Sequence, residues 1–262
     1  MGCLSMRRMS IGRMGNDEPP GAAPFDPTAS LPAHQQMSRV VVFGVGPIAE
    51  LAHFYLTHDS PHDVVGFTVD SEYLRDSSFR GLPVVPFETL DERHAPDDVS
   101  LFLPISFKRM NHVRAERVAS AKARGYELIS YVSSRATTFP GFECGENCFI
   151  LEDNTIQPFV RVGDDVILWS GNHVGHHSVI EDHVMVTSHV VISGGCTIEP
   201  HCFLGVNSTI RDETVIGRET LVGAGVTILH DTAPHSVYKV TDAEPAGFRS
   251  DQIRAISHKS GG

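Results

Sequence analysis

The sequence lacks several features that would assign it to a broad class of protein at once. No segment approaches the roughly 18 consecutive apolar residues that a membrane-spanning helix requires. The formal net charge is -11 at pH 7, so the excess of cationic side chains that supports general nucleic-acid binding is missing. We therefore expect a soluble protein without a membrane span or a nucleic-acid partner, in which any anionic ligand is bound by local groups.

Paired cysteines are also missing. The five cysteines, Cys3, Cys144, Cys148, Cys196 and Cys202, include no CxxC spacing, and no apolar core typical of a signal peptide precedes them. Both features favour the reducing cytoplasm as the setting. Cys196 and Cys202 fall at inward positions of the repeat described below, so we interpret them as small core residues.

The composition divides the chain into four segments. Residues 1–37 are rich in Gly, Pro, Ser and Met, and we expect a disordered extension, or a true start near Met37. Residues 38–141 alternate short β-branched runs, such as "RVVVFGVGP", with helical stretches, which predicts a Rossmann-like α/β domain. Residues 142–240 are repetitive, and residues 241–262 are expected to form a C-terminal tail with a short helix.

The strongest signal is a period of six in residues 142–240. Aliphatic side chains recur without a break at Val162, Leu168, Val174, Ile180, Val186, Ile192, Ile198, Leu204, Ile210, Ile216, Val222 and Ile228. Four residues after each comes a second inward position, which is mostly small or β-branched. A helix cannot keep a period of six on one face, and an ordinary sheet has a period of two. A hexapeptide β-helix, in which three faces of six residues each make one coil, satisfies the pattern.

Five histidines crowd the stretch "NHVGHHSVIEDHVMVTSHVVI": His173, His176, His177, His183 and His189. A zinc site like that of the β-helix carbonic anhydrases would take two histidines five residues apart and a third from another coil. No pair within this stretch has that spacing, so a zinc hydrolase is disfavoured.

Coil geometry separates these histidines into two groups. His177, His183, His189 and His201 share one register, three residues after the aliphatic position, and we interpret them as exposed turn residues. His176 lies outside that register. Because equivalent positions of successive coils stack, His176 is expected beside Gly194, and Gly194 beside Asp212. A side-chain base next to a backbone N–H is the arrangement that acyl transfer requires.

With these motifs the chain resembles a known family, the left-handed β-helix acyltransferases that modify nucleotide-linked amino sugars and are grouped with sialic-acid O-acetyltransferases. The resemblance covers about residues 39–240 and is most specific in "SGNHVGHHSVIEDHV" and "IEPHCFLGVNSTIRDETVIG". It implies a homotrimer with a Rossmann-like domain before a left-handed parallel β-helix. It also implies acetyl-CoA as acyl donor, no metal, a nucleotide-linked amino sugar as acceptor, and a role in surface-polysaccharide (lipopolysaccharide) biosynthesis.

The resemblance also implies roles for individual residues. His176 matches the catalytic base, and we take the backbone N–H of Gly194 as the donor to the tetrahedral oxyanion. Acyl-CoA would contact main-chain groups at Gly194, Val206 and Ala224. The nucleotide end of the sugar would lie near Gly44, Gly46 and Asp70.

One departure from the family concerns the base. Relatives often follow the base with a carboxylate, whereas this chain has His177. The group that orients His176 is then Glu181, Asp182 or none. Three hypotheses for the function stay open at this stage. We favour an N-acyltransferase. The alternatives are a sugar O-acetyltransferase and a non-catalytic β-helix that binds a nucleotide sugar.

Overall fold

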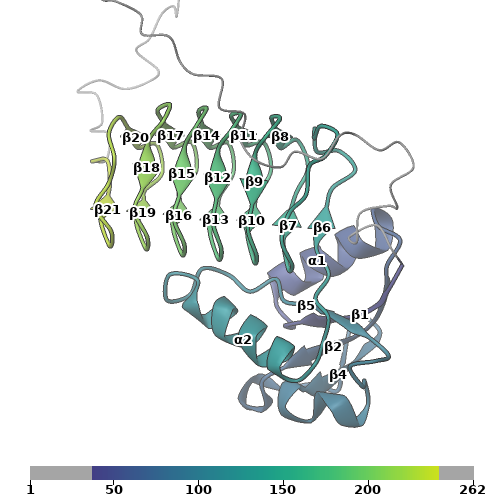
Figure 1. Ribbon diagram of the computed structural model, residues 1–262. Coiled ribbons are helices and arrows are strands. Elements are labelled where there is room, and N and C mark those ends of the chain that lie inside the picture. Colours follow the sequence, from purple (N-terminus) through teal and green to yellow (C-terminus); the bar gives the residue numbers. More distant parts are fainter. Residues whose placement is uncertain (1–36, 242–262) are drawn as a thin grey trace, which may run out of the picture. The chain divides into compact units, whose positions relative to one another are not determined.

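The structure is a computed structural model that describes residues 37–241 (Figure 1). The extension expected over residues 1–37 and the tail expected over residues 241–262 therefore lie outside the described residues, apart from Met37 and Thr241. Within the described range, no helix is both long and apolar enough to cross a membrane.

An α/β domain comes first, as the alternation of strands and helices predicts. Its five-stranded sheet has the order β3-β4-β2-β1-β5, and its neighbouring strands are parallel except for the β3–β4 pair. The elements are β1 (Arg39–Phe43), α1 (Pro47–His58), β2 (Asp63–Val69), β3 (Ser78–Phe79), β4 (Leu82–Pro86), β5 (Ser100–Phe102) and α2 (His112–Ala123).

The inner strand β1, between β2 and β5, is buried on both sides, because the two helices cover opposite faces of the sheet. Val40 and Val42 pack in one cluster with Ala52 and Leu56 of α1. Val41 belongs to a second cluster that contains Val118 and Ala121 of α2. Two short 3-10 helices, Ser71–Tyr73 and Phe87–Glu92, follow β2 and β4.

The rest of the described chain is a three-faced parallel β-helix, which confirms the predicted fold. Face one contains β6 (Tyr131–Val132), β7 (Phe149–Ile150), β10 (Ile167–Leu168), β13 (Met185–Val186), β16 (Phe203–Leu204), β19 (Leu221–Val222) and β21 (Val237–Tyr238). Face two contains β8 (Thr155–Ile156), β11 (His173–Val174), β14 (Val191–Ile192), β17 (Thr209–Ile210) and β20 (Thr227–Ile228). Face three contains β9 (Arg161–Val162), β12 (Val179–Ile180), β15 (Thr197–Ile198) and β18 (Val215–Ile216).

The period of six places side chains as predicted. Every aliphatic position from Ile150 to Ile228 is buried, and so are the second inward positions, including Cys196 and Cys202, which have no exposed surface. Strands on successive coils pair in register, for example Ile167 with Met185. Burial of each aliphatic side chain stabilises the coil by about 1.5–3 kcal/mol, so the stacked layers account for its packing.

The corners of the coil explain the histidine-rich stretch. The first corner joins face one to face two, the second joins face two to face three, and the third joins face three to face one. A residue with positive φ turns many of these corners, among them His177 (φ 60), His183 (φ 62), His189 (φ 59) and His201 (φ 61). Histidine, like Asn and Asp, is enriched in this left-handed conformation, which most side chains avoid.

Coil pairing starts before the domain boundary expected at residues 141 and 142. The stretch "YELISYVS" was expected to close the α/β series. Instead its strand β6 pairs in parallel with β7 on face one of the coil. Its pairing with the α/β sheet is an isolated bridge between Leu101 and Leu128.

A buried charged network joins α2 to the third corner. The Arg114 guanidinium, which is fully buried, donates from Nε to Asp165 Oδ1 at 2.9 Å. Its Nη2 donates to the carbonyl oxygens of Asp165 (2.9 Å) and His183 (3.1 Å), which belong to successive coils. Asn147 Nδ2 donates to the same carboxylate at 2.7 Å. These bonds satisfy the buried charges and fasten the α/β domain to the coil.

A left-handed turn leads into α2. Three consecutive residues, Arg109 (φ 53), Met110 (φ 50) and Asn111 (φ 66), have positive φ, which costs roughly 1–2 kcal/mol per residue. Asn111 Nδ2 donates to Cys202 O at 3.2 Å. The contact with the coil thus helps to hold a turn that the local sequence disfavours.

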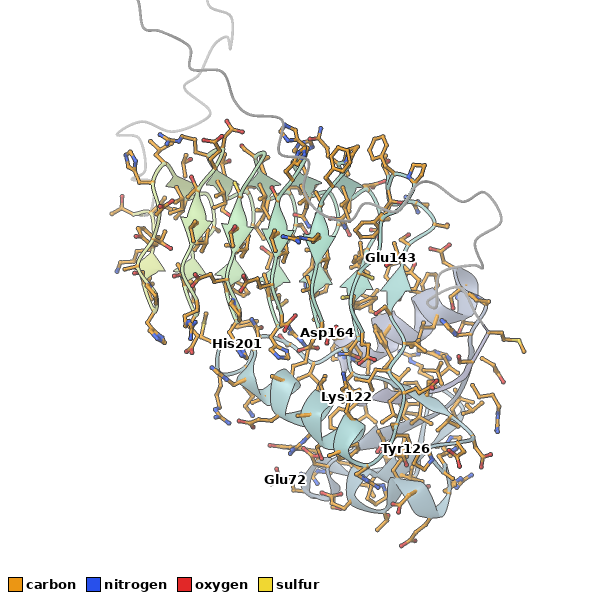
Figure 2. The ribbon with its side chains drawn as sticks, in the orientation of Figure 1. Glu72, Lys122, Tyr126, Glu143, Asp164 and His201 are labelled. Atoms are coloured by element: carbon orange, nitrogen blue, oxygen red, sulfur yellow. The ribbon has the colours of Figure 1, made fainter. Side chains whose placement is uncertain are left out.

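The interpretation of the register histidines as exposed turn residues is wrong for His183 and His201. His183 Nδ1 lies 2.8 Å from Asp165 Oδ2. The His201 ring stacks between His183 (centroids 4.7 Å apart) and His112 of α2 (4.1 Å), and Figure 2 shows His201 at the edge of the coil beside α2. The docked helix covers a corner that would be exposed in an isolated coil. His189 is exposed, as expected.

We expect Arg114→Met to lower the free energy of unfolding by about 3–5 kcal/mol, because the Asp165 carboxylate would be left buried without its partner. The matched control is Arg109→Met, since Arg109 makes an exposed ion pair with Glu116, which is worth at most about 1 kcal/mol. Urea denaturation of both variants measures the difference. Equal losses in the two variants would contradict the structural role of the buried pair.

Stability should also fall at mildly acidic pH. Burial, together with the nearby His183 and His112, lowers the pKa of His201 from 6.5 to about 4. Between these values the unfolded chain binds a proton that the folded chain does not, so the free energy of unfolding decreases as the pH falls through this window. Urea denaturation from pH 7 to 4 should show a shallower decrease for His201→Asn, which keeps a left-handed residue but cannot titrate. Parallel plots of the free energy of unfolding against pH for the two proteins would disprove the contribution of His201.

Candidate active site

His176 lies at the second corner with its ring exposed. Its backbone N–H donates to Gln157 Oε1 of the preceding coil at 2.9 Å. Its Nδ1 lies 3.1 Å from Nδ1 of His177. The Nε2 atom makes no hydrogen bond to any described residue, so it is open to a proton from outside the chain.

Gly194 lies directly beside the His176 ring, as the stacking of successive coils predicts. A Cβ atom at Gly194 would be 2.8 Å from His176 Cε1 and 3.0 Å from Nε2. Real Cβ atoms do not approach that closely, so any other residue would displace the ring. Gly194 thus provides the space that the imidazole occupies.

The expectation that the Gly194 N–H is open to an oxyanion is not met in this structure. That N–H donates to Asp212 Oδ1 at 3.1 Å. The stacking of Asp212 beside Gly194 was predicted, but its hydrogen bond was not. A corner residue with a short carboxylate reaches back to the N–H of the coil before it, as Asp182 does for Asp164 (2.8 Å).

The group that contacts the base is neither Glu181 nor Asp182. In the described chain, neither carboxylate makes a hydrogen bond with His176. Both residues come after β12 and lie at the third corner, whereas His176 lies at the second. His177 makes the contact instead. The sequence held one clue, since His177 directly follows His176.

Val206 and Ala224 stack at the first corner, on successive coils. Both are exposed, and neither backbone N–H donates to an acceptor among residues 37–241. A Cβ atom at Gly205 would lie only 2.6 Å from the Ala224 nitrogen, so glycine is required there. Two main-chain donors therefore point to a ligand or solvent, unlike the N–H of Gly194.

Gly44 and Gly46 form the turn between β1 and α1. Gly44 has φ +109, which suits glycine, and its N–H donates to Thr68 O at 2.7 Å. Gly46 caps α1 without a side-chain hydrogen bond, and a Cβ atom there would meet nothing within 4 Å. The open helix start can accept an anionic group.

Asp70 follows β2, as predicted, but its carboxylate already has a cationic partner. Arg117 of α2 donates to Asp70 Oδ2 from Nη2 (2.9 Å) and from Nε (3.2 Å). The Asp70 side chain is only 14% exposed. A ribose hydroxyl would therefore meet a carboxylate that Arg117 holds in place.

The predicted subsites lie at different parts of the coil. His176 and Gly194 occupy the second corner, Val206 and Ala224 the first corner, and the α/β domain is fastened to the third. No hydrogen bond or ion pair joins any two of these three groups within the described chain.

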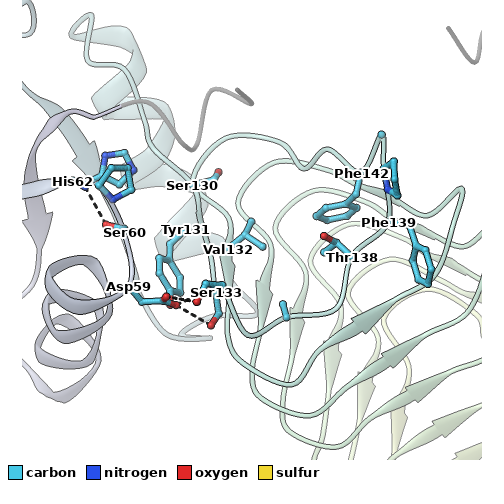
Figure 3. A pocket seen from close by; sticks show the side chains of 15 residues that line it. Asp59, Ser60, His62, Ser130, Tyr131, Val132, Ser133, Thr138, Phe139 and Phe142 are labelled. Atoms are coloured by element: carbon cyan, nitrogen blue, oxygen red, sulfur yellow. Dashed lines mark hydrogen bonds between the residues drawn. The ribbon is translucent and has the colours of Figure 1, made fainter. Parts of the chain in front are cut away.

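A cavity of about 740 Å³ lies elsewhere, between the end of α1 and the start of the coil (Figure 3). Asp59 Oδ2 accepts hydrogen bonds there from Tyr131 Oη (2.6 Å) and Ser133 Oγ (3.0 Å). Burial acts to raise the pKa of Asp59, but hydrogen bonds from Ser134 and Tyr131 hold it below its ordinary value. No residue predicted for the site lines this cavity.

Sequence comparison gives a partial family match. The bacterial transferase hexapeptide (six repeats) family matches residues 195–230. No curated protein sequence matches the chain.

Three solved structures share the fold over 76% to 77% of this chain. The acetyltransferase domain of PglB from Neisseria gonorrhoeae has 18% identity and a TM-score of 0.66 over 76% of this chain and 95% of that one. PerB from Caulobacter crescentus, in complex with CoA and GDP-perosamine, has 23% identity and a TM-score of 0.66 over 76% and 92%. WeeI from Acinetobacter baumannii has 18% identity and a TM-score of 0.59 over 77% and 96%. The chain therefore has the fold of the left-handed β-helix, hexapeptide-repeat sugar acetyltransferases.

Proposed function

We propose that this protein is an acyl-CoA-dependent N-acyltransferase, with acetyl-CoA as the donor and a nucleotide-linked amino sugar as the acceptor. The observation that carries the proposal is the exposed His176 ring, held against Gly194 with Nε2 free. The fold shared with PerB, a structure solved with CoA and GDP-perosamine, supports the same substrates. A cytoplasmic role in surface-polysaccharide biosynthesis follows from the family resemblance.

The chemistry needs one base. His176 Nε2 takes the proton from the sugar amine as the nitrogen attacks the thioester carbonyl. The C–N bond forms, the C–S bond breaks, and coenzyme A leaves as a thiolate that takes up the proton held by His176, which restores the base. No covalent enzyme intermediate is required. Of the described cysteines, Cys148, Cys196 and Cys202 are buried and unsuited to attack.

The donor would lie along the first corner. The free N–H groups of Val206 and Ala224 suit the carbonyl oxygens of a pantetheine arm, which need donors and no charge. The acceptor's nucleotide would lie at Gly44, Gly46 and the start of α1, where the helix dipole favours a diphosphate.

A homotrimer is part of this proposal. His176 and the Val206–Ala224 pair occupy different corners of the β-helix, and this separation supports a site in which a neighbouring chain brings its own first corner to the base. Threefold packing of three-faced coils places unlike corners side by side in a closed ring. The active site would then lie between two subunits.

The first test is thiol release from acetyl-CoA with a panel of nucleotide sugars that carry an amino or only a hydroxyl group. We expect turnover with amino sugars alone. His176→Ala should lower kcat at neutral pH by about 100-fold or more, with partial recovery at alkaline pH, because a free amine needs the base less than a hydroxyl does. Turnover with hydroxyl sugars alone would indicate O-transfer, and no thiol release would leave a binding protein.

A second prediction concerns the main-chain donors. Ala224→Pro removes one N–H at a corner position where this chain already tolerates proline, as at Pro158 and Pro200. We expect KM for acetyl-CoA to rise about 2- to 13-fold, which corresponds to the loss of one hydrogen bond of about 0.5–1.5 kcal/mol.

The matched control for this variant is Ser170→Pro, at the same corner but three coils away from Ala224. It should leave the KM for acetyl-CoA unchanged. A rise in KM of the same size in both variants would show that the prolines disturb the coil, and an unchanged KM in Ala224→Pro would remove this N–H from the donor site.

A further inference from the structure

His177 makes two contacts that an ordinary exposed turn residue does not need. Its Nδ1 lies 3.1 Å from Nδ1 of His176. Its ring also packs against Phe159 of the preceding coil, with ring centroids 4.7 Å apart. The His177 ring is therefore held between the base on one side and an aromatic ring on the other.

The contact between the two Nδ1 atoms restricts the protons on both rings. A neutral imidazole carries its proton on one nitrogen only, and a hydrogen bond needs one donor and one acceptor. If His176 donates from Nδ1, its Nε2 carries a lone pair and can take a proton. If His177 donates instead, His176 carries its proton on Nε2 and cannot act as a base.

The other contacts of His176 leave this choice to His177. Gln157 bonds only the backbone N–H of His176, and Gly194 contributes space rather than a polar group. A flip of the imidazole ring would exchange nitrogen and carbon positions with little change in shape. Among the described residues, the His177 nitrogen is the one polar side-chain atom that bonds the ring, so it alone distinguishes these states.

Phe159 is the second contact of His177. It is 68% exposed and has φ 68, the left-handed conformation of the corner register, which a bulky residue rarely adopts. Its ring contacts the His177 ring at the second corner. That contact limits the directions in which the His177 imidazole can point.

We propose that His177, held by Phe159, is the positioning residue of the base: its Nδ1 accepts a hydrogen bond from Nδ1–H of His176 and so leaves His176 Nε2 free to take the proton. This inference rests on the proposed N-acyl transfer. An imidazole at this position orients the base without adding a negative charge beside the acceptor.

The kinetic test compares His177→Ala with His177→Asn. Asparagine tolerates the left-handed conformation and offers a carbonyl oxygen to His176 Nδ1–H. We expect His177→Ala to lower kcat about 10-fold or more, as loss of a partner that orients a functional imidazole does, with the KM of both substrates nearly unchanged. His177→Asn should recover most of that loss.

The matched control is His235→Ala. His235 has the same φ as His177 (60) and is exposed, but it lies at the third corner beside Glu219, outside the proposed donor site and away from the base. The two alanine variants carry the same backbone strain, so only the loss of the imidazole contact distinguishes them. An equal kcat in the two variants, with the wild type active, would overturn the role of His177 and leave the proposed function intact.

A double-mutant cycle separates positioning from general structure. In a His176→Ala background, His177→Ala should cause no further loss of residual turnover, because the ring that it positions is gone. A further loss as large as in the wild-type background would show a purely structural role and overturn the inference.

A measurement without turnover decides the inference even if the proposed function fails. The ¹⁵N chemical shifts of the His176 ring, in protein labelled at histidine, report which nitrogen carries the proton. We expect the Nδ1–H form in the wild type and in His177→Asn, and a mixture in His177→Ala. The Nε2–H form in the wild type would overturn the inference, whereas absence of thiol release with any amino sugar would overturn only the proposed function.

Discussion

The corner of the coil is the constraint on which the rest of this structure depends. Each face is short, and most described corners turn on a residue with positive φ. That requirement selects residue types that tolerate the conformation, and it fixes which side chains stack on successive coils. His177, His183 and His189 recur because the corners accept histidine in this conformation. His176 does not have positive φ, and its distinguishing neighbour is Gly194 of the next coil.

Backbone N–H groups at these corners differ in whether a carboxylate reaches them. Asp212 takes the N–H of Gly194, and Asp182 takes that of Asp164, whereas Val206 and Ala224 keep theirs free. A three-faced coil thus presents backbone N–H donors at its corners. A single carboxylate on the next coil can occupy such a donor, and where no carboxylate reaches it, the donor is available to a ligand. Binding specificity can reside in the main chain while side chains decide which parts of it are exposed.

Much of this arrangement follows from the sequence, because it depends on arithmetic along the chain. The period of six predicts the coil, and the step of one full coil places Gly194 beside His176 and Asp212 beside Gly194. Contacts that depend on a side chain's rotamer do not follow from that arithmetic, such as the bond from Gly194 to Asp212 or the pairing of His176 with His177. The cover that α2 gives to His183 and His201 was also unpredictable, because Arg114 and Asp165 are 51 positions apart.

The network at the third corner has a consequence for how the chain acquires its structure during synthesis. Asn111 directly precedes α2 and Arg114 lies within it, yet their partners in the coil lie 51 to 91 positions later, as far as Cys202. Until those coils have left the ribosome, Arg114 lacks the partners that bury it in the folded chain. The left-handed turn before α2 lacks its contact with Cys202. Folding of the two parts is therefore coupled across a long loop, which makes the last docking step slow relative to local events. Truncation within the coil would then damage the domain that precedes it.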